Sequence, residues 1–346
     1  MDNSRREVLG IGVTAAAIGS LAQAGPAAAQ TGGSGMDAGA PKGKGLRLVT
    51  FAPIASAPPR VGVVRDDGKV VDLTTAGAGK LAFDPTSMVS LIAAGAGALE
   101  AVRMAAASGD GPHVSAVRLF APIPKLTRNI YAVGWNYLEH FEEGQASRAQ
   151  KTDYPEHPVF FTKAVHSING PFDPIPYDAK VSTLIDWEAE LAVIIGQGGR
   201  NISEADAMKH VFGYTVINDT TARDVQSKKH GGQWFKGKSL DGHGPMGPWI
   251  IPAGELDHDN LRLFTRVNGV VKQDASTKQM YFKLPRIIAE LSLGLTLEPG
   301  DIIATGTPPG VGNARKPPEY LKPGDVMETE IAEIGIIRNT IQAVPA

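Results

Sequence analysis

Three acidic side chains stand at alternate positions where an apolar run begins. The segment LIDWEAELAVII carries Asp186, Glu188 and Glu190 and continues with residues suited to a buried strand. Side chains alternate across a strand, so these three acids are expected on one face. Carboxylates crowded beside buried apolar residues repel one another and resist the loss of water. A solvated sheet edge, a basic side chain or a bound cation must therefore accommodate them.

A second reactive group follows about thirty residues later. The segment VFGYTVINDTTARDVQ predicts an apolar strand that ends at Asp219, followed by a helix capped by Thr220 or Thr221. Arg223 and Gln226 are three residues apart, so on a helix they share a face. Arg223 either points into a site or pairs only with a neighbouring aspartate, Asp219 or Asp224.

Three further stretches carry residues suited to acid–base or charge chemistry. In NIYAVGWNYLEHFEE, His140 and Glu143 can hydrogen-bond if the segment is helical, and otherwise Glu142 takes the place of Glu143. Lys238 lies in the glycine-flanked loop of QWFKGKSLDG. Thr307 follows a short predicted strand in GDIIATGTPPGVG.

Length and composition place these residues in a globular protein. The 346 residues are 42% hydrophobic and 20% charged, which is enough apolar material for one large or two smaller domains. Acids outnumber bases by 36 to 34, and no basic stripe indicates nucleic-acid binding. The chain has no cysteine, which excludes disulfides, thiolate metal sites and cysteine nucleophiles.

The N-terminus has the features of a twin-arginine signal peptide. Arg5 and Arg6 precede a short Gly/Ala-rich apolar stretch and a small-residue exit, so residues 1–29 are interpreted as a signal for export to the periplasm. The apolar part is too short for a membrane anchor, which needs about 20 strongly apolar residues. Residues 30–45 are interpreted as a flexible linker.

The pattern beyond the linker predicts an α+β, mainly β protein. Residues 46–125 are expected to form a small α+β domain, with a hairpin in RVGVVRDDGKVVDL and a glycine-broken helical stretch. Residues 126–346 contain strand-rich runs separated by Pro and Gly turns, and one clear helix in KLPRIIAELSLGL. Long helices that alternate regularly with strands are missing, so a doubly wound sheet is not expected.

Four motifs resemble the fumarylacetoacetate hydrolase family, in its branch with a small N-terminal domain that includes acylpyruvate hydrolases and 2-hydroxyhepta-2,4-diene-1,7-dioate isomerases. The motifs are DWEAELAVIIG, NDTTARDVQ, KGKSLD and LEPGDIIATGTPPGVG, and the similarity runs from about residue 46 to 341. The resemblance implies a mixed β-sandwich roll for the catalytic domain, and a homodimer.

The resemblance also implies a divalent cation held by Glu188, Glu190 and Asp219. Oxygen ligands without thiols suit a hard ion, with Mg²⁺ expected and Mn²⁺ or Ca²⁺ as alternatives. Asp186 is expected to orient a ligand or a backbone amide instead.

Family members act on 2-oxo acids, which gives the remaining residues their predicted roles. Lys238, Arg223 and Gln226 correspond to groups that support negative charge on the substrate or a developing oxyanion. His140, oriented by Glu143, is expected to activate water. Thr307, Asn136 and Tyr137 are assigned to substrate binding. Trp135 is bulky beside the His–Glu pair and is expected to narrow the pocket.

The resulting hypothesis is a metal-dependent hydrolase that cleaves a C–C bond in an acylpyruvate-like or fumarylacetoacetate-like acid through a metal-bound enolate. A 2-oxo acid decarboxylase and a 2-hydroxymuconate-type isomerase remain open, because the same residues serve all three reactions. A non-catalytic periplasmic module that binds a cation or a 2-oxo acid is the alternative from another class. GTPPGVG lacks the Lys-Ser/Thr of a phosphate-binding loop, which argues against a nucleotide site.

Overall fold

The computed structural model describes residues 45–77, 79–145 and 153–345. The predicted signal peptide (1–29) and all but the last residue of the predicted linker lie outside the described residues. Within the described ranges, no helix has both the length and the apolar character needed to cross a bilayer.

The larger sheet has eleven strands and contains the segments that carry the acids. Its strands are β1 (Arg47–Ala52), β2 (Arg60–Val64), β3 (Val70–Asp72), β4 (Arg118–Leu119), β5 (Ile130–Gly134), β6 (Val159–Lys163), β7 (Ile168–Asn169), β10 (Ala189–Ile195), β11 (Val211–Asn218), β13 (Gly244–Pro252) and β16 (Ile302–Ala304). Their order is β3-β2-β1-β13-β11-β10-β16-β5-β6, with β4 on β1 and β7 on β13. Pairing is antiparallel except between β16 and β5 and between β13 and β7.

A second sheet packs against the larger one. It has the order β15-β14-β17-β18-β8, and its strands are β8 (Ile175–Tyr177), β14 (Arg262–Val267), β15 (Val270–Ser276), β17 (Val326–Ile331) and β18 (Gly335–Ala343). Buried Leu191 and Val216 of the first sheet share one apolar cluster with Leu263 and Ile337 of the second. The predicted β-rich α+β fold with a mixed sandwich is therefore confirmed.

Seven α-helices complete the regular structure. They are α1 (Leu73–Ala76), α2 (Met88–Ala93), α3 (Ala96–Ser108), α4 (Leu138–Gln145), α5 (Arg223–Lys228), α6 (Phe235–Lys238) and α7 (Leu284–Ser292) among the described residues. Helix α7 is the one predicted most clearly, because Leu284, Ile287, Ile288 and Leu291 form an apolar stripe and are all buried.

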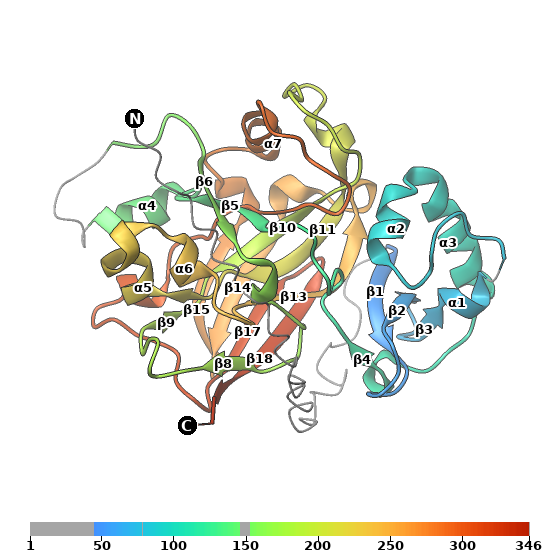
Figure 1. Cartoon of the computed structure of the whole chain (residues 1–346), viewed down its shortest axis with the longest axis horizontal. Coiled ribbons are helices and arrows are strands. Elements are labelled where there is room, and N and C mark those ends of the chain that lie inside the picture. Colours follow the sequence, from blue (N-terminus) through green and yellow to red (C-terminus); the bar gives the residue numbers. More distant parts are fainter. Residues whose placement is uncertain (1–44, 78, 146–152, 346) are drawn as a thin grey trace, which may run out of the picture. The chain divides into compact units, whose positions relative to one another are not determined.

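The N-terminal helices accompany the first three strands. Helices α1, α2 and α3 lie beside β1, β2 and β3 (Figure 1). The predicted hairpin is β2–β3, and the glycine-broken helical stretch is α2 and α3, separated at Gly95, which has φ of +73°. The buried residues of α2 and α3 belong to one apolar cluster with Ala192 of β10 and Ile302 of β16. The proposed domain division at residues 125 and 126 stays a prediction.

The acidic segment is not one continuous strand. Residues 185–186 form β9, which pairs with β12 (Thr221–Ala222), whereas β10 begins at Ala189 and pairs with β11 and β16. Between them, side-chain oxygens accept the backbone N–H groups: Asn218 from Glu188 at 3.1 Å and Gln273 from Ala189 at 3.0 Å. Alternation therefore keeps Glu188 and Glu190 together, but it does not place Asp186 with them.

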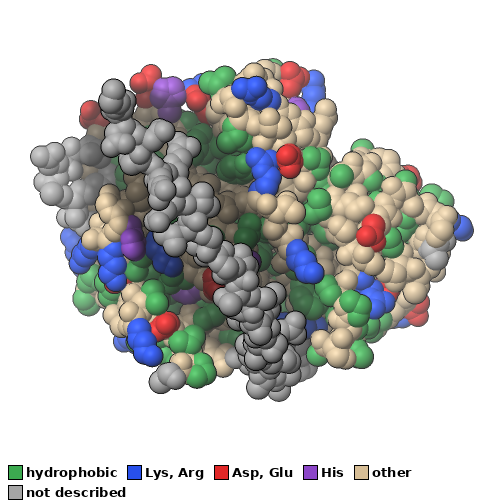
Figure 2. Space-filling model, viewed as in Figure 1, with side chains coloured by type: hydrophobic (Ala, Val, Ile, Leu, Met, Phe, Trp, Pro, Cys, Tyr) green, Lys and Arg blue, Asp and Glu red, His purple; other side chains and the backbone are tan. Residues whose placement is uncertain are grey.

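Charged side chains of both signs are interspersed over the described part of the face in Figure 2. They agree with the near balance of 34 basic and 36 acidic residues in the sequence. The concentration of charge that matters for chemistry is instead buried.

A buried histidine predicts acid sensitivity of the fold. His243 is 3% exposed, and its Nε2 lies 2.8 Å from the Pro176 carbonyl oxygen. Burial lowers the pKa of His243 from 6.5 to about 4, although the hydrogen bond to Pro176 works in the opposite direction. The unfolded chain takes up a proton at the higher pKa, so stability falls as pH drops through this interval. We expect a loss of up to about 3 kcal/mol between pH 7 and pH 4 from this residue.

The measurement is urea unfolding of wild type and His243→Gln at both pH values. The variant is expected to lose less stability on acidification, and His157→Gln, at a histidine whose side chain is 63% exposed, serves as the control. Equal acid sensitivity of wild type and His243→Gln contradicts the prediction.

Candidate active site

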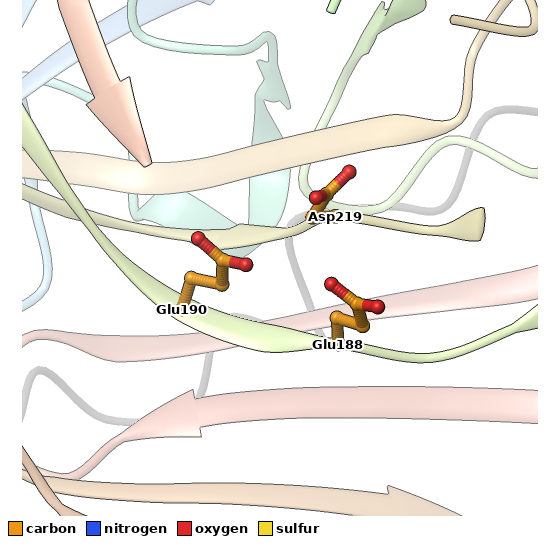
Figure 3. A group of neighbouring side chains, drawn as sticks. All are labelled: Glu188, Glu190 and Asp219. Atoms are coloured by element: carbon orange, nitrogen blue, oxygen red, sulfur yellow. The ribbon is translucent and has the colours of Figure 1, made fainter. Parts of the chain in front are cut away.

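Two neighbouring strands bring three carboxylates together. Glu188 directly precedes β10, Glu190 lies within it, and Asp219 directly follows β11. The Asp219 N–H donates to the Glu188 carbonyl at 2.8 Å, which fixes the two strand ends side by side. One carboxylate oxygen from each residue lies within 4.8 Å of the others, and all three residues are buried. Figure 3 shows Glu188 and Glu190 along one strand and Asp219 beside them.

Two of the three acids have basic partners. The Lys238 ammonium donates to Glu188 at 2.7 Å and to Asp219 at 2.6 Å, and Arg223 Nη1 lies 2.8 Å from Glu188. Glu190 has no such pair within salt-bridge distance in the described part of the chain, and it accepts the Gly306 N–H at 2.7 Å. The negative charge of Glu190 is therefore the least compensated of the three.

The pKa shifts follow from this difference. Burial raises the pKa of Glu190 well above its ordinary value, and the charges of Asp219 and Glu188 add to the effect. Burial also opposes ionisation of Glu188, but the charges of Lys238 and Arg223 outweigh it and lower the pKa of Glu188 to about 2. A cation that approaches Glu190 would relieve the repulsion that makes its ionised form costly.

The donor set fits a hard divalent cation. All three candidate ligands are carboxylates, which Mg²⁺, Mn²⁺ and Ca²⁺ bind. Two oxygens on one ion lie at most two bond lengths apart, about 4.2 Å for Mg²⁺ and about 5 Å for Ca²⁺. The upper limit of 4.8 Å on the separation of the three oxygens is compatible with an ion of this class.

His140 and Glu143 form the predicted hydrogen-bonded pair. They lie on α4, with His140 Nδ1 2.8 Å from Glu143 Oε1. The other carboxylate oxygen of Glu143 accepts the Gly310 N–H at 2.9 Å, which fixes its position. In the neutral imidazole whose Nδ1–H donates to this carboxylate, Nε2 carries the lone pair. Glu142 is not the partner, since its carboxylate accepts from the Tyr154 hydroxyl.

Arg223 begins α5 and points into the acidic centre. Its Nε donates to Asp186 at 2.7 Å, and Nη1 also contacts Gln226 Oε1 at 3.2 Å. The alternative in which Arg223 pairs only with Asp219 or Asp224 is therefore wrong. Its buried Nη2 has no hydrogen-bond partner among the described residues, so a donor is available for a ligand.

Asp186 orients its surroundings, as expected, instead of joining the cluster. Its carboxylate accepts the N–H groups of Gly312 at 2.7 Å and Asn313 at 2.9 Å, as well as the Arg223 guanidinium. These bonds tie the loop after β16 to the helix that carries Arg223.

The three predicted substrate-binding residues have unequal positions. Thr307 lines the cavity, but its hydroxyl already donates to the Ala189 carbonyl at 3.0 Å and accepts from Gln273 at 2.8 Å. Asn136 is fully buried, and its amide bonds to the backbone of Phe282 and Thr305.

Tyr137 is also fully buried, and its hydroxyl has no hydrogen-bond partner among the described residues. Neither Asn136 nor Tyr137 lines the cavity. Substrate contact by Thr307 stays a prediction with which its place in the cavity lining agrees, whereas the positions of Asn136 and Tyr137 do not support such contact.

Lys163, at the end of β6, is a residue that sequence reasoning missed. It is fully buried, and its ammonium donates to Asp219 Oδ1 at 2.7 Å and to the Lys238 carbonyl. Asp219 is thereby held from one side by Lys163 and from the other by Lys238. The segment FFTKAV carries no pattern that separates Lys163 from an ordinary strand-end lysine.

Seven of the eleven predicted site residues line one cavity. It has about 40 Å³ open to water, the volume of about three water molecules by the measure in which one needs 10–15 Å³. The lining includes Val133, Gly134, Trp135, His140, Phe161, Glu188, Glu190, Arg223, Gln226, Trp234, Lys238 and Thr307. A base, several cations and a carboxylate cluster here suit reactions in which a carbon acid loses a proton and an oxygen gains negative charge.

A buried polar pocket of this kind, at the strand ends of a two-sheet β fold, is typical of an enzyme, and the comparisons narrow the class. Residues 129–342 match the family described as Fumarylacetoacetate (FAA) hydrolase C-terminal. This is more than half of the chain, and the protein belongs to the fumarylacetoacetate hydrolase family, as the sequence motifs predicted.

Relatives match most of the chain. The mitochondrial oxaloacetate tautomerase fahd2 of Xenopus laevis is 42% identical over 304 residues, 86% of this chain and 90% of its own length. Oxaloacetate tautomerase YisK of Bacillus subtilis (strain 168) is 42% identical over 295 residues, 81% of this chain and 95% of its own length.

Solved structures agree with the fold. Fumarylacetoacetate hydrolase of psychrophilic Exiguobacterium antarcticum aligns with a TM-score of 0.72 and 39% identity, over 86% of this chain and all of that one. Maleylpyruvate hydrolase of Sphingobium sp. SYK-6, in complex with manganese (II) ion and pyruvate, aligns with a TM-score of 0.69 and 29% identity over the same shares.

Glu190→Gln tests the carboxylate cluster. The substitution keeps the shape of the side chain and removes its charge, so Mn²⁺ affinity is expected to fall by more than the roughly 10–100-fold that loss of an outer partner costs. The metal-free protein is expected to be no less stable, because the charge removed has no basic partner. Isothermal titration with Mn²⁺ and thermal unfolding without metal measure both effects.

Asp301→Asn is the matched control, because Asp301 is a buried carboxylate outside the cluster that pairs with Arg128. It should leave Mn²⁺ affinity unchanged. Wild-type affinity in Glu190→Gln would contradict the assignment of Glu190.

Lys163→Met tests the support behind Asp219. Removing one partner of a fully buried ion pair costs about 3–5 kcal/mol, so the urea midpoint of the metal-free protein should fall markedly. Lys209→Met is the control: its ammonium lies at the same 2.7 Å from an aspartate, Asp206, but both side chains are exposed. Solvent screening makes that pair weak. Equal midpoint shifts in the two variants would show that Lys163 does not support the site.

Proposed function

We propose that this protein is a divalent-cation-dependent tautomerase that interconverts the keto and enol forms of oxaloacetate or a closely related 2-oxo dicarboxylic acid. The observation that carries the proposal is the meeting, in one small cavity, of a carboxylate-oriented histidine with Glu188, Glu190 and the cations Lys238 and Arg223. The Lys238 ammonium also contacts Asp219, the third acid of the cluster. The 42% identity to two oxaloacetate tautomerases supports this choice of reaction among those open to the family.

Glu188, Glu190 and Asp219 are the residues that would hold the cation. Mg²⁺ remains the expected ion, and Mn²⁺ is supported by its presence with pyruvate in the related maleylpyruvate hydrolase. A bound divalent ion supplies Lewis acidity, which lowers the cost of negative charge on the 2-oxo oxygen.

The chain's own residues move the proton. His140 Nε2 removes a proton from the carbon next to the 2-oxo group, and the C–H electron pair becomes the C=C bond while charge moves to oxygen. The proton ends on that oxygen, so the reaction consumes nothing and releases nothing. Glu143 holds the imidazole by its Nδ1–H and favours the charged state that His140 passes through. Lys238 and the free Nη2 of Arg223 stabilise the negative charge.

Hydrolysis of an acylpyruvate C–C bond, the reaction predicted from the sequence, is the second candidate. The maleylpyruvate hydrolase structure matches this fold, and an oriented histidine can act as a general base toward water or toward a carbon acid. The two reactions differ in their products, because tautomerisation leaves the carbon chain whole and hydrolysis yields two acids.

The test follows both reactions on purified protein with Mg²⁺ or Mn²⁺. Enol decay of oxaloacetate is monitored by its ultraviolet absorbance, and acylpyruvate cleavage by chromatography of the acids formed. We expect His140→Ala to lower kcat for tautomerisation by about 10²–10⁴-fold, the usual contribution of a general base, with Mn²⁺ affinity unchanged.

Glu143→Gln and Glu142→Gln form a matched pair on the same helix. Only the first removes the partner of His140, so only the first should reduce kcat. Full activity of His140→Ala would remove the base from the proposal. Cleavage of acylpyruvates without enol–keto interconversion of oxaloacetate would favour the hydrolase.

A further inference from the structure

Trp135 has a backbone conformation that is unusual for a large side chain. It follows β5 directly and has φ of +57°, in the left-handed region that bulky residues rarely adopt. The next residue, Asn136, is fixed by hydrogen bonds to Phe282 and Thr305, which hold the backbone in place. A conformation that costs energy and is nevertheless held by its surroundings often marks a functional position.

The ring of Trp135 is part of an aromatic wall. The Trp135 and Trp234 rings meet edge to face at 5.0 Å between centroids, and Phe161 meets Trp234 in the same way at 5.3 Å. Gly134 permits this packing, because a Cβ at that position would overlap the Trp234 ring. We use "aromatic wall" for Trp135, Phe161 and Trp234, which come from three separate segments.

The aromatic wall and the polar groups bound the same cavity. All three wall residues line it, together with His140, Arg223 and two acids of the carboxylate cluster, Glu188 and Glu190. Phe161 also lies against the charged side, with its ring centroid 5.1 Å from the Lys238 ammonium. A ligand whose oxo-acid end binds the charged side therefore has the wall, and not open solvent, beside the rest of its chain.

We propose that Trp135, braced by Trp234, is a specificity-determining residue that limits the length of the 2-oxo acid the cavity accepts. Compact acids fit between the charged side and the aromatic wall, whereas longer unbranched chains meet the Trp135 ring. The cavity's small volume, about 40 Å³, agrees with such a limit. The inference rests on the proposed function in so far as the cavity binds 2-oxo acids.

The test measures binding, so that it does not depend on turnover. Dissociation constants of pyruvate, 2-oxobutyrate and 2-oxohexanoate are determined by calorimetry on the Mn²⁺-loaded full chain. Wild type is expected to bind 2-oxohexanoate much more weakly than pyruvate. In Trp135→Ala the ratio of the two constants should shift by at least about 10-fold toward the longer acid, since one methylene in an apolar pocket is worth about 10–200-fold.

Three variants complete the design. Trp234→Ala removes the brace from another segment and should shift the ratio in the same direction, which keeps the test valid if Trp135→Ala does not fold. Trp135→Phe should give a smaller shift. Phe235→Ala is the matched control, because Phe235 neighbours Trp234 but is 45% exposed and does not line the cavity.

The outcomes separate this inference from the proposed function. If the protein is inactive on oxaloacetate but Trp135→Ala relaxes the length limit, the role of the aromatic wall is supported and the proposed tautomerase activity is rejected. If the protein is active on oxaloacetate, and Trp135→Ala and Trp234→Ala bind Mn²⁺ but keep the wild-type length preference, the proposed role of Trp135 in limiting substrate length is overturned.

Discussion

Confinement of negative charge away from water is the constraint on which the rest of this structure depends. The buried centre contains one more acid than base: the acids are Asp186, Glu188, Glu190 and Asp219, and the bases are Lys163, Arg223 and Lys238. Removing ions from water is expensive, and the cost is recovered only when each charge has close partners. The strands, the short helices and the loops around the centre can be understood as the framework that supplies those partners.

The loop after β16 supplies partners from its backbone. The N–H of Gly306 donates to Glu190, that of Gly310 to Glu143, and that of Gly312 to Asp186. Gly306 has φ of +99°, and a side chain there would meet Asn136, so glycine is required at this position. One loop therefore fixes the relative positions of the His140–Glu143 pair on α4, Glu190 of the carboxylate cluster, and Asp186. Asp186 in turn accepts a hydrogen bond from Arg223.

Local patterns predicted much of this arrangement. The stripe of α7, the β2–β3 hairpin and the spacing of His140 and Glu143 each depend on neighbours within a few residues, so the sequence was sufficient for them. The pairing of Glu188 and Glu190 with Asp219 required the family motifs as well, because the two strands are about thirty residues apart.

What the sequence could not show depends on long-range contacts. Asp186 does not belong to the carboxylate cluster, and after it the backbone N–H groups of Glu188 and Ala189 bond to side chains that are distant in the sequence, Asn218 and Gln273. Helix α5 is preceded by Ala222 and not capped by a threonine, since the Thr221 hydroxyl donates to the Asp219 carbonyl instead. Lys163 lies 56 residues from Asp219, and nothing local marks its burial.

The hydrogen bonds donated by the backbone of the loop after β16 have an evolutionary consequence. Main-chain amides are present whatever side chains surround them, so the hydrogen bonds that orient Glu190, Glu143 and Asp186 depend on the chain path and the glycine positions. The rings opposite the reactive centre, by contrast, are ordinary side chains that single codon changes can replace. Such a division allows descendants of one ancestral gene to acquire new substrates while the inherited chemistry stays intact.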